Sequence, residues 1–300
     1  MITVSALTKT FDGFQALGDL TINVKQGSIY GLIGINGSGK TTALKIITGI
    51  LRPDSGSVTM GGEAVYENLA IKRRMGFIPD ELWFFGSYKL SECAKFYSKL
   101  YPEWSAERYR DMTEKFGLPE NRKLNRFSKG MQKQAAFILT MSSNPDFLVL
   151  DEPIDGLDPL IRKLVWKYIV DDVATRRMTV LVSSHNLREM EGICDSIGIL
   201  DKGKMLMERE LDELKSDIHK IQVAYPDSVA QEGRYEGLNV LHKESKGSID
   251  LVIVRSPREL VDSVIYKNSP LLFDVLPLSL EEIFIYELGG GLSERMQILF

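Results

Sequence analysis

The sequence has only two cysteines, Cys93 and Cys194, among its 300 residues. A count this low argues against a disulfide-built fold and suits a reducing compartment, and the wide spacing matches no metal-binding pattern. Long apolar runs are absent as well: the longest spans five residues, at 135–139, whereas a membrane-spanning helix needs about 20. The beginning of the chain lacks the apolar core of a signal peptide. We therefore expect a cytoplasmic chain that does not itself cross a membrane.

An excess of charge of either sign is also absent. The chain has 37 Lys and Arg against 41 Asp and Glu, a net charge of −4, so no overall basic field favours nucleic acid and we expect no nucleic-acid partner. With 44% apolar and 26% charged residues, the composition excludes disorder as the dominant state. The length suffices for one large domain or two.

Short apolar runs alternate with amphipathic helical patterns over the first 200 residues. Strands buried on both faces are predicted at 28–33, 146–150, 179–183 and 197–200. Asp158 is a candidate N-cap for a helix that begins at Pro159. This alternation predicts an α/β domain with a mostly parallel central sheet over residues 1–210.

Two stretches of this domain depart from the alternation. Residues 3–7, 20–24 and 58–60 have the pattern of an antiparallel β part. Residues 87–140 are almost entirely helical in pattern and predict a helical subdomain. Its first helix is expected to place four residues on one face: Leu90, Ala94, Tyr97 and Leu100.

The pattern changes again after about residue 207. Strands are expected at 221–225, 249–254 and 271–276, with a helix at 257–267. Ser279 and Glu282 have the spacing of a capping box, which opens a last helix before the glycines at 289–291. We interpret the charged run 208–213 as a solvated helix face. These elements predict a small C-terminal α+β domain at 217–288, followed by a tail at 289–300.

The segment from Gly34 to Thr41 fits the phosphate-loop pattern G-x-x-x-x-G-K-[ST] and has a predicted strand before it and a helix after it. Glycines allow successive N–H groups to point at phosphate oxygens, and the helix N-terminus adds a positive dipole end. Lys40 is expected to reach the β- and γ-phosphates and Thr41 to bind Mg²⁺. The nucleotide-binding residues predicted here are Gly34, Ile35, Asn36, Gly37, Ser38, Gly39, Lys40, Thr41 and Thr42. Taken alone, the loop is compatible with a kinase, a GTPase or a motor.

A pair of carboxylates ends the apolar strand near residue 150. Asp151 is placed to hold the hydration shell of Mg²⁺, and Glu152 to polarise a water for in-line attack on the γ-phosphate. Two further candidate site residues lie at predicted ends of a helix and a strand. Ser128 is a candidate N-cap of a helix and hence an anion site, and His185 ends the strand at 179–183.

Together these segments resemble the ATP-binding subunits of ABC transporters over about residues 2–210. GINGSGKTT resembles the Walker A motif, FLVLDE the Walker B motif, FSKGMQ the family signature, IDGLD the D-loop and SSH the histidine switch. The resemblance implies a P-loop NTPase fold of ABC type, with ATP and Mg²⁺ as ligands. It also implies that Phe11 stacks on adenine, that Glu152 is the general base and that His185 contacts the γ-phosphate.

The same resemblance implies how two chains work together. Two such domains pair head to tail, and each ATP lies between the phosphate loop of one and the signature residues Ser128 and Gly130 of the other. The D-loop then crosses the seam between them. The pair is either a homodimer or includes a sister ATPase subunit.

Two positions depart from the family pattern. The signature has Lys129 and Met131 where the family usually has glycine and glutamine, a form that resembles the exporter-type subgroup. Asp80 ends the segment GFIPD where the family usually has a glutamine that touches Mg²⁺. Asp80 keeps an oxygen ligand but loses the amide donor, so we expect retained Mg²⁺ binding and altered coupling.

The resemblance implies an ATPase that drives a separate transmembrane permease, lies on the inner face of the cell membrane and contacts the membrane only through that permease. The ending PLSLEEIFIYELGG resembles exporter-type subunits and favours efflux. An aromatic cluster after Asp80 is expected to dock on the permease: Trp83, Phe84 and Phe85. The alternative is an ABC-type ATPase acting on a ribosome or nucleic-acid complex, and a phosphate-loop kinase or GTPase is a more distant one.

Overall fold

The structure, a computed structural model, describes residues 1–84, 87–213, 218–226 and 233–288. The chain divides into two compact units, one of residues 1–185 with 192–208 and the other of residues 186–191 with the residues from 209 onward. We call them unit 1 and unit 2 and consider each by itself. Within the described residues, no helix is long and apolar enough to span a membrane. Phe85 and the predicted tail at 289–300 lie outside the described residues.

The main sheet of unit 1 has six strands in the order β10-β9-β3-β8-β7-β6. Their bounds are β3 (Ile29–Ile33), β6 (Met75–Ile78), β7 (Phe147–Asp151), β8 (Thr179–Ser184), β9 (Ser196–Asp201) and β10 (Lys204–Glu210). All the pairings among β9, β3, β8, β7 and β6 are parallel. The strands β3, β7 and β8 are buried at every residue, which confirms the prediction of a parallel central sheet. Because these strands run the same way, their carboxyl ends share one edge.

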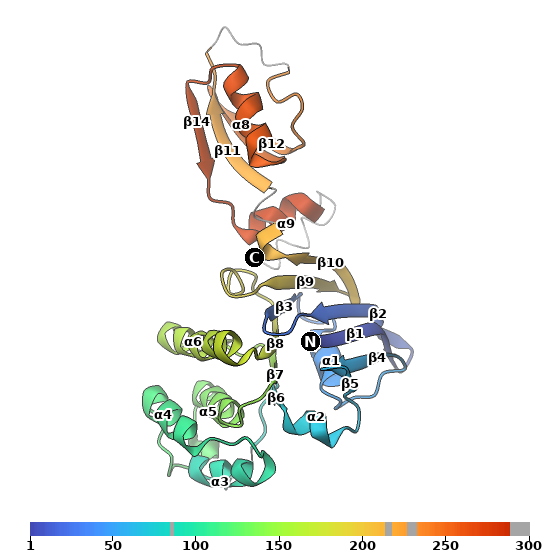
Figure 1. The fold of residues 1–300 in the computed structure, drawn as a ribbon, viewed down its shortest axis with the longest axis vertical. Helices are drawn as coiled ribbons and strands as arrows, with labels where there is room; N and C mark the ends of the chain where they lie inside the picture. The colour runs from blue at the N-terminus through green and yellow to red at the C-terminus, as the bar shows by residue number, and fades with distance from the viewer. Residues whose placement is uncertain (85–86, 214–217, 227–232, 289–300) are drawn as a thin grey trace. The chain divides into compact units, whose positions relative to one another are not determined.

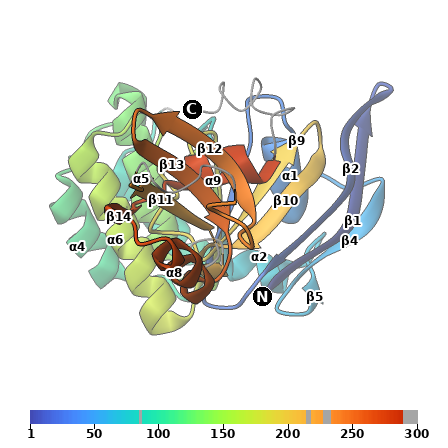
Figure 2. The same ribbon diagram turned by 90° about the horizontal axis from the view of Figure 1, so that it is seen from above.

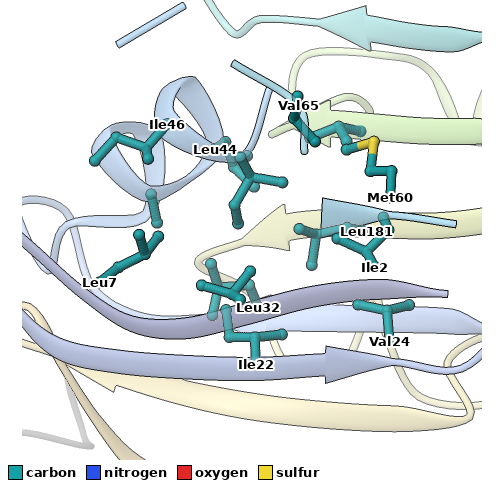
Figure 3. Close-up of a cluster of buried hydrophobic side chains, with 14 of the residues drawn as sticks. Ile2, Leu7, Ile22, Val24, Leu32, Leu44, Ile46, Met60, Val65 and Leu181 are labelled. Carbon is teal, nitrogen blue, oxygen red and sulfur yellow. The ribbon is translucent and has the colours of Figure 1, made fainter. Parts of the chain in front are cut away.

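The second sheet of unit 1 is antiparallel, in the order β2-β1-β4-β5, as the N-terminal pattern predicts. Its strands are β1 (Ile2–Phe11), β2 (Phe14–Val24), β4 (Ser55–Met60) and β5 (Glu63–Ala64). The helix α1 (Lys40–Ile47) lies between the two sheets (Figures 1 and 2). Figure 3 shows the resulting core, in which Ile22 of the antiparallel sheet, Leu44 of α1 and Leu181 of the main sheet belong to one cluster.

Helices cover the other face of the main sheet, where α4, α5 and α6 lie together in both views (Figures 1 and 2). The helical elements are α2 (Leu69–Arg73), α3 (Leu90–Leu100), α4 (Ala106–Phe116), the 3₁₀ turn η1 (Leu124–Arg126), α5 (Lys129–Ser142) and α6 (Pro159–Arg176). The Asp158 carboxylate accepts hydrogen bonds from the N–H groups of Leu160 and Ile161, which confirms the predicted cap. One detail of the prediction is wrong. Leu100 is 48% exposed, because Cys93 joins Leu90 and Ala94 in the buried face and Leu100 falls at its edge.

Unit 2 contains an antiparallel sheet in the order β12-β13-β11-β14. Its elements are β11 (Ile218–Ala224), β12 (Val240–Lys246), β13 (Ile249–Arg255), α8 (Arg258–Lys267), β14 (Leu272–Leu276) and α9 (Leu280–Leu288). Ser279 and Glu282 form the predicted capping box, each N–H donating to the other side chain. The strand β12 was not predicted, because it is an edge strand with mostly exposed side chains and hence no apolar alternation.

The charged run at 208–213 is only in part the solvated helix face that we predicted: residues 211–213 are helical, and Asp212 and Glu213 are exposed. The first three residues of the run continue the edge strand β10 instead. The carboxylate of Glu208 accepts a hydrogen bond of 2.8 Å from the hydroxyl of Tyr30, which is 1% exposed. Burial and the adjacent carboxylate both raise the pKa of Tyr30, so its hydroxyl stays a proton donor. A buried phenol needs such an acceptor.

Candidate functional site

A cavity of about 360 Å³ opens beside the loop between β3 and α1. Its lining comes from the β1–β2 hairpin, this loop with the start of α1, and the segments that follow β6 and β7. The lining residues are Phe11, Phe14, Ala16, Asn36, Gly37, Gly39, Lys40, Thr41, Thr42, Asp80 and Glu152. The structure thus brings most of the predicted nucleotide-binding residues together around one space.

The phosphate loop curls because its glycines adopt backbone angles that other residues rarely reach. Gly37 has φ 82° and Gly39 has φ 108°, both in the left-handed region. At Gly39 a Cβ would collide with the carbonyl oxygen of Ala16, whereas at Gly37 the space is open. Gly34, Ile35 and Ser38 do not line the cavity and instead shape the loop. The loop therefore has the open, amide-lined form that fits phosphate oxygens.

Lys40 is the first residue of α1, and only 6% of it is exposed. Its ammonium donates to the carbonyl oxygens of Gly34 at 2.7 Å and Ile35 at 3.3 Å. The same nitrogen lies 3.3 Å from Oε1 of Glu152. The loop therefore holds a buried positive charge at the cavity wall, as the motif predicted.

The residues at the end of β7 provide a fitting place for a hard divalent cation. Oδ2 of Asp151 accepts a hydrogen bond of 2.8 Å from the Thr41 hydroxyl, and Oδ1 accepts one of 2.6 Å from Ser183. One carboxylate and one hydroxyl beside a phosphate site suit Mg²⁺, which takes its remaining ligands from phosphate and water. Among the described residues there is no group of three or more His, Cys, Asp and Glu that could hold a metal by itself. Ser183 was missed from the sequence, because nothing local distinguishes it from the other serine of β8.

Glu152 follows Asp151 in an unusual backbone conformation, with φ 47°. Its N–H donates to Oγ of Ser183 at 3.1 Å. Its Oε2 lies 2.9 Å from Nδ1 of His185 and 3.3 Å from the backbone nitrogen of that residue. Its Oε1 is buried without a hydrogen-bond partner, since the nearby Lys40 ammonium lacks hydrogen-bonding geometry. The carboxylate therefore has an acceptor left for a water molecule.

The β1–β2 hairpin contributes two aromatic rings rather than one. Phe11 and Phe14 pair directly across the turn, which Asp12 and Gly13 form with φ angles of 46° and 84°. Both rings line the cavity and are 41% and 69% exposed, respectively. We predicted only Phe11. The signal for Phe14 was the Asp-Gly dipeptide between them, which is typical of a tight hairpin turn.

The signature residues lie elsewhere on unit 1. Ser128 caps α5 by accepting a hydrogen bond of 3.2 Å from the N–H of Met131, as expected. Ser128 is exposed, and Gly130 lies next to the carbonyl of Gly156 in the D-loop segment. Neither residue is among those lining the cavity. Within the described residues of one chain, the phosphate loop and the signature are therefore separate surfaces.

A second cavity, of about 200 Å³, lies beside the segment after Asp80. It is lined mainly by apolar and aromatic side chains: Phe77, Pro79, Leu82, Trp83, Phe84, Tyr88, Cys93, Phe96, Tyr97, Ala136 and Thr140. Trp83 stays 76% exposed at this cavity. Burial raises the pKa of the Cys93 thiol to about 11, followed by a smaller effect of the Glu92 charge. Cys93 thus acts as a small apolar residue of the wall.

Comparisons with known proteins identify the family of the chain. Residues 17–155 match the family model described as ABC transporter. Over 97% of its length the chain is 32% identical to the ABC transporter ATP-binding protein YtrB of Bacillus subtilis, and the alignment covers 99% of that protein. It is 31% identical, again over 97% of its length, to the bacitracin transport ATP-binding protein BcrA of Bacillus licheniformis, of which 98% is covered.

Solved structures show the same fold. An ATP-binding subunit of an ABC transporter has a TM-score of 0.67 and 26% identity, covering 72% of this chain and 92% of that one. The ATP-binding cassette MJ0796, solved as a dimer with ADP and Pi, has a TM-score of 0.64 and 22% identity, covering 70% of this chain and 99% of that one. Both alignments leave more than a quarter of the chain uncovered.

Proposed function

Because this chain belongs to the family of ABC transporter ATP-binding proteins, we propose that it is the subunit that hydrolyses ATP to drive a separate membrane permease. The observation that carries the proposal is that Lys40, Thr41 and Glu152 line one cavity, while Asp151 contacts Thr41 and His185 contacts Glu152. A kinase would direct its carboxylate at a substrate hydroxyl. Here the carboxylate of Glu152 is instead enclosed by Lys40 and His185, which suits the activation of water.

In the proposed reaction the loop amides and Lys40 hold the β- and γ-phosphates of ATP. Mg²⁺, held by Thr41 and Asp151 with Asp80 as a further oxygen ligand, supplies charge neutralisation when bound. Glu152 accepts a proton from a water molecule as the water oxygen attacks the γ-phosphorus. His185 orients that carboxylate and contacts the γ-phosphate. Phe11, with Phe14 beside it, stacks on the adenine.

The remote position of Ser128 and Gly130 supports a shared site. If both residues bind ATP but lie off the cavity of their own chain, they serve the nucleotide of a second chain. Each ATP then joins two subunits, and hydrolysis lets them part, as in other γ-phosphate switches. We propose a head-to-tail dimer, formed by two copies or with a sister ATPase subunit.

Mixing two inactive variants tests this arrangement. In a mixed dimer of Lys40→Ala and Ser128→Arg chains, the intact Lys40 of the second chain meets the intact Ser128 of the first. One complete site therefore forms, and ATPase activity should recover above the level of either variant alone. If both residues served one nucleotide within one chain, every site would keep a lesion and mixing would restore nothing.

The mixed dimers are first verified with two affinity tags. Dimers of a wild-type chain with a Lys40→Ala chain, which have one intact and one damaged site, serve as the control. Wild-type ATPase activity that rises steeply with protein concentration would support the dimer. If the control shows that one intact site suffices for turnover and the mixed dimers are verified, a lack of recovery would contradict the head-to-tail arrangement.

The aromatic cavity gives the permease a place to bind, which puts the chain on the inner face of the membrane. Trp83 presents a large exposed ring three positions after Asp80, so a partner seated there would bind the segment that follows a residue of the nucleotide cavity. The relative named for bacitracin transport favours efflux as the direction. Replacing Trp83 with Ser should abolish cosedimentation with membranes that contain the permease while leaving the ATPase activity of the isolated chain intact. Unchanged cosedimentation would place the docking surface elsewhere.

A further inference from the structure

Lys133 lies in the first half of α5, and its ammonium has two partners from distant parts of the chain. It donates to the backbone carbonyl oxygen of Glu152 at 2.8 Å. It also forms an ion pair of 3.1 Å with Oδ1 of Asp80. The Lys133 side chain is 13% exposed, whereas that of Asp80 is 49% exposed. The charge-assisted hydrogen bond to the Glu152 carbonyl is partly buried and is the stronger contact, while the ion pair with Asp80 is open to solvent and weaker.

The bond to Glu152 lies at a strained position of the backbone. A φ of 47° is unfavourable for a residue with a Cβ, and such a conformation persists only where its surroundings hold it. Ser183 holds the N–H of Glu152, and Lys133 holds the carbonyl. These two contacts fix the backbone conformation of Glu152, and this conformation directs the Glu152 side chain toward Lys40 and His185.

The bond to Asp80 connects the same ammonium to a different surface. Asp80 lines the nucleotide cavity, and the segment that follows it, from Leu82 to Phe84, lines the aromatic cavity. The Lys133 side chain therefore contacts both Asp80, which precedes the segment at the aromatic cavity, and the backbone of Glu152, the proposed general base. A glutamine at position 80 could not form this ion pair, because its side chain has no charge.

We propose that Lys133 is a positioning residue for ATP hydrolysis, which holds Glu152 in its left-handed conformation and makes this hold depend on Asp80. The inference rests on the proposed role of Glu152 as general base. Lys133 contacts no reacting atom and acts through the peptide of Glu152. Displacement of the segment at Asp80 loosens the ion pair, and Lys133 transmits the displacement to the carboxylate.

The test compares Lys133→Met, which keeps the length and removes the charge, with the conservative Lys133→Arg. Loss of one charge-assisted hydrogen bond predicts a fall in kcat of roughly 10- to 100-fold for Lys133→Met. KM for ATP and the affinity measured by calorimetry should stay within about twofold, because Lys133 does not line the cavity. Lys133→Arg should recover most of kcat. Lys115→Met, which removes an exposed helical-subdomain lysine paired with Asp111, is the matched control and should retain wild-type kcat.

Two double variants separate this inference from the proposed function. In a Glu152→Gln background, Lys133→Met should reduce the residual rate no further, since its effect passes through the lost carboxylate. In an Asp80→Asn background, Lys133→Met should lower kcat by a smaller factor than it does in the wild type, because the ion pair is already lost. An undiminished effect of Lys133→Met in either background, or an ATP affinity that falls in step with kcat, would overturn the positioning role. Wild-type turnover in Glu152→Gln itself would instead refute the proposed function. Thermal unfolding identifies any variant that fails to fold. If Lys133→Met does not fold, the kcat of Lys133→Arg is measured in its place.

Discussion

Each unit contains a well-buried carboxylate, and the two carboxylates are held in different ways. Glu152 of unit 1 has one oxygen bonded to His185, while the other has no hydrogen-bond partner and lies beside a cavity. Asp250 of unit 2 is 6% exposed and accepts hydrogen bonds from Ser245 at 2.5 Å and from Tyr235 at 2.7 Å. Lys243 and Arg234 add ion pairs to it at 3.2 and 3.7 Å.

The difference separates the carboxylate proposed as a general base from a structural one. Both oxygens of Asp250 accept hydrogen bonds from neighbours within its own unit, so that it ties β13 to the segments around it. Glu152 keeps an unused acceptor in a strained backbone conformation, which is held by contacts from β8, from the residue after β8 and from α5. Buried charge alone therefore does not mark a site. An unused acceptor beside a cavity does.

The largest expected effect is on Glu152. Replacing it with Gln keeps the shape but removes the proton acceptor, so ATP hydrolysis should fall by roughly 10²–10⁴-fold while ATP binding persists. Phosphate release and calorimetry measure the two quantities. The variant should also accumulate as an ATP-bound dimer on gel filtration. Asp250→Asn is the counterpart in unit 2 and should hydrolyse ATP at the wild-type rate. Equal losses in the two variants would remove the distinction between the carboxylates.

Lys40→Ala should weaken the binding of nucleotide itself. Loss of the charged hydrogen bonds to phosphate predicts an affinity for Mg-ATP that is weaker by roughly 10- to 100-fold. Isothermal titration measures it, with Lys115→Ala as a control for the loss of a positive charge. Wild-type affinity in Lys40→Ala would mean that the loop does not bind phosphate.

Asp250→Ala should act on stability alone. Its removal leaves Tyr235 and Ser245 without their acceptor and Lys243 and Arg234 without their counter-charge, which should lower the free energy of unfolding of unit 2 by about 1–3 kcal/mol. Hydrogen exchange in β11 and β13 gives the loss in unit 2 specifically. Glu282→Ala, which removes a less buried carboxylate of the same unit, should cost less. A fall in ATPase rate in a folded Asp250→Ala variant would show that the two carboxylates do not have separate roles.

The smallest expected effect is a dependence on pH. Burial raises the pKa of Asp250, but the hydrogen bonds from Ser245, Tyr235 and Lys243 outweigh it and hold the pKa below its ordinary value of 3.8. A lowered native pKa means that the stabilisation is complete above the unfolded pKa and is lost as the pH falls through the native one. The stability advantage of the wild type over Asp250→Asn should therefore be constant above about pH 5 and shrink below pH 4. Chemical unfolding of both proteins across this range measures the difference. An advantage that grows with acid would reverse the sign of the pKa shift.

Features encoded in one continuous segment could be predicted well. The phosphate loop, the buried strands ending in Asp151 and Ser184, and the caps at Asp158 and Ser279 each depend on neighbours within a few residues. For such features the residue types directly report backbone conformation and burial. Where the apolar pattern was weak, as in the edge strand β12, the prediction failed because the exposed side chains report no burial.

The sequence by itself thus determined the family and the P-loop fold and predicted the reactive groups, since glycine placement, strand hydrophobicity and the order of motifs are local properties. Only the tertiary structure decided which distant groups meet. The strand order places β3, β7 and β8 side by side and so brings Lys40, Glu152 and His185 together. It also places Lys133 between Asp80 and the carbonyl of Glu152, across 53 and 19 positions of the chain. No pattern in the sequence expresses such a contact, because it depends on how α5 packs beside the sheet and not on the residues next to Lys133.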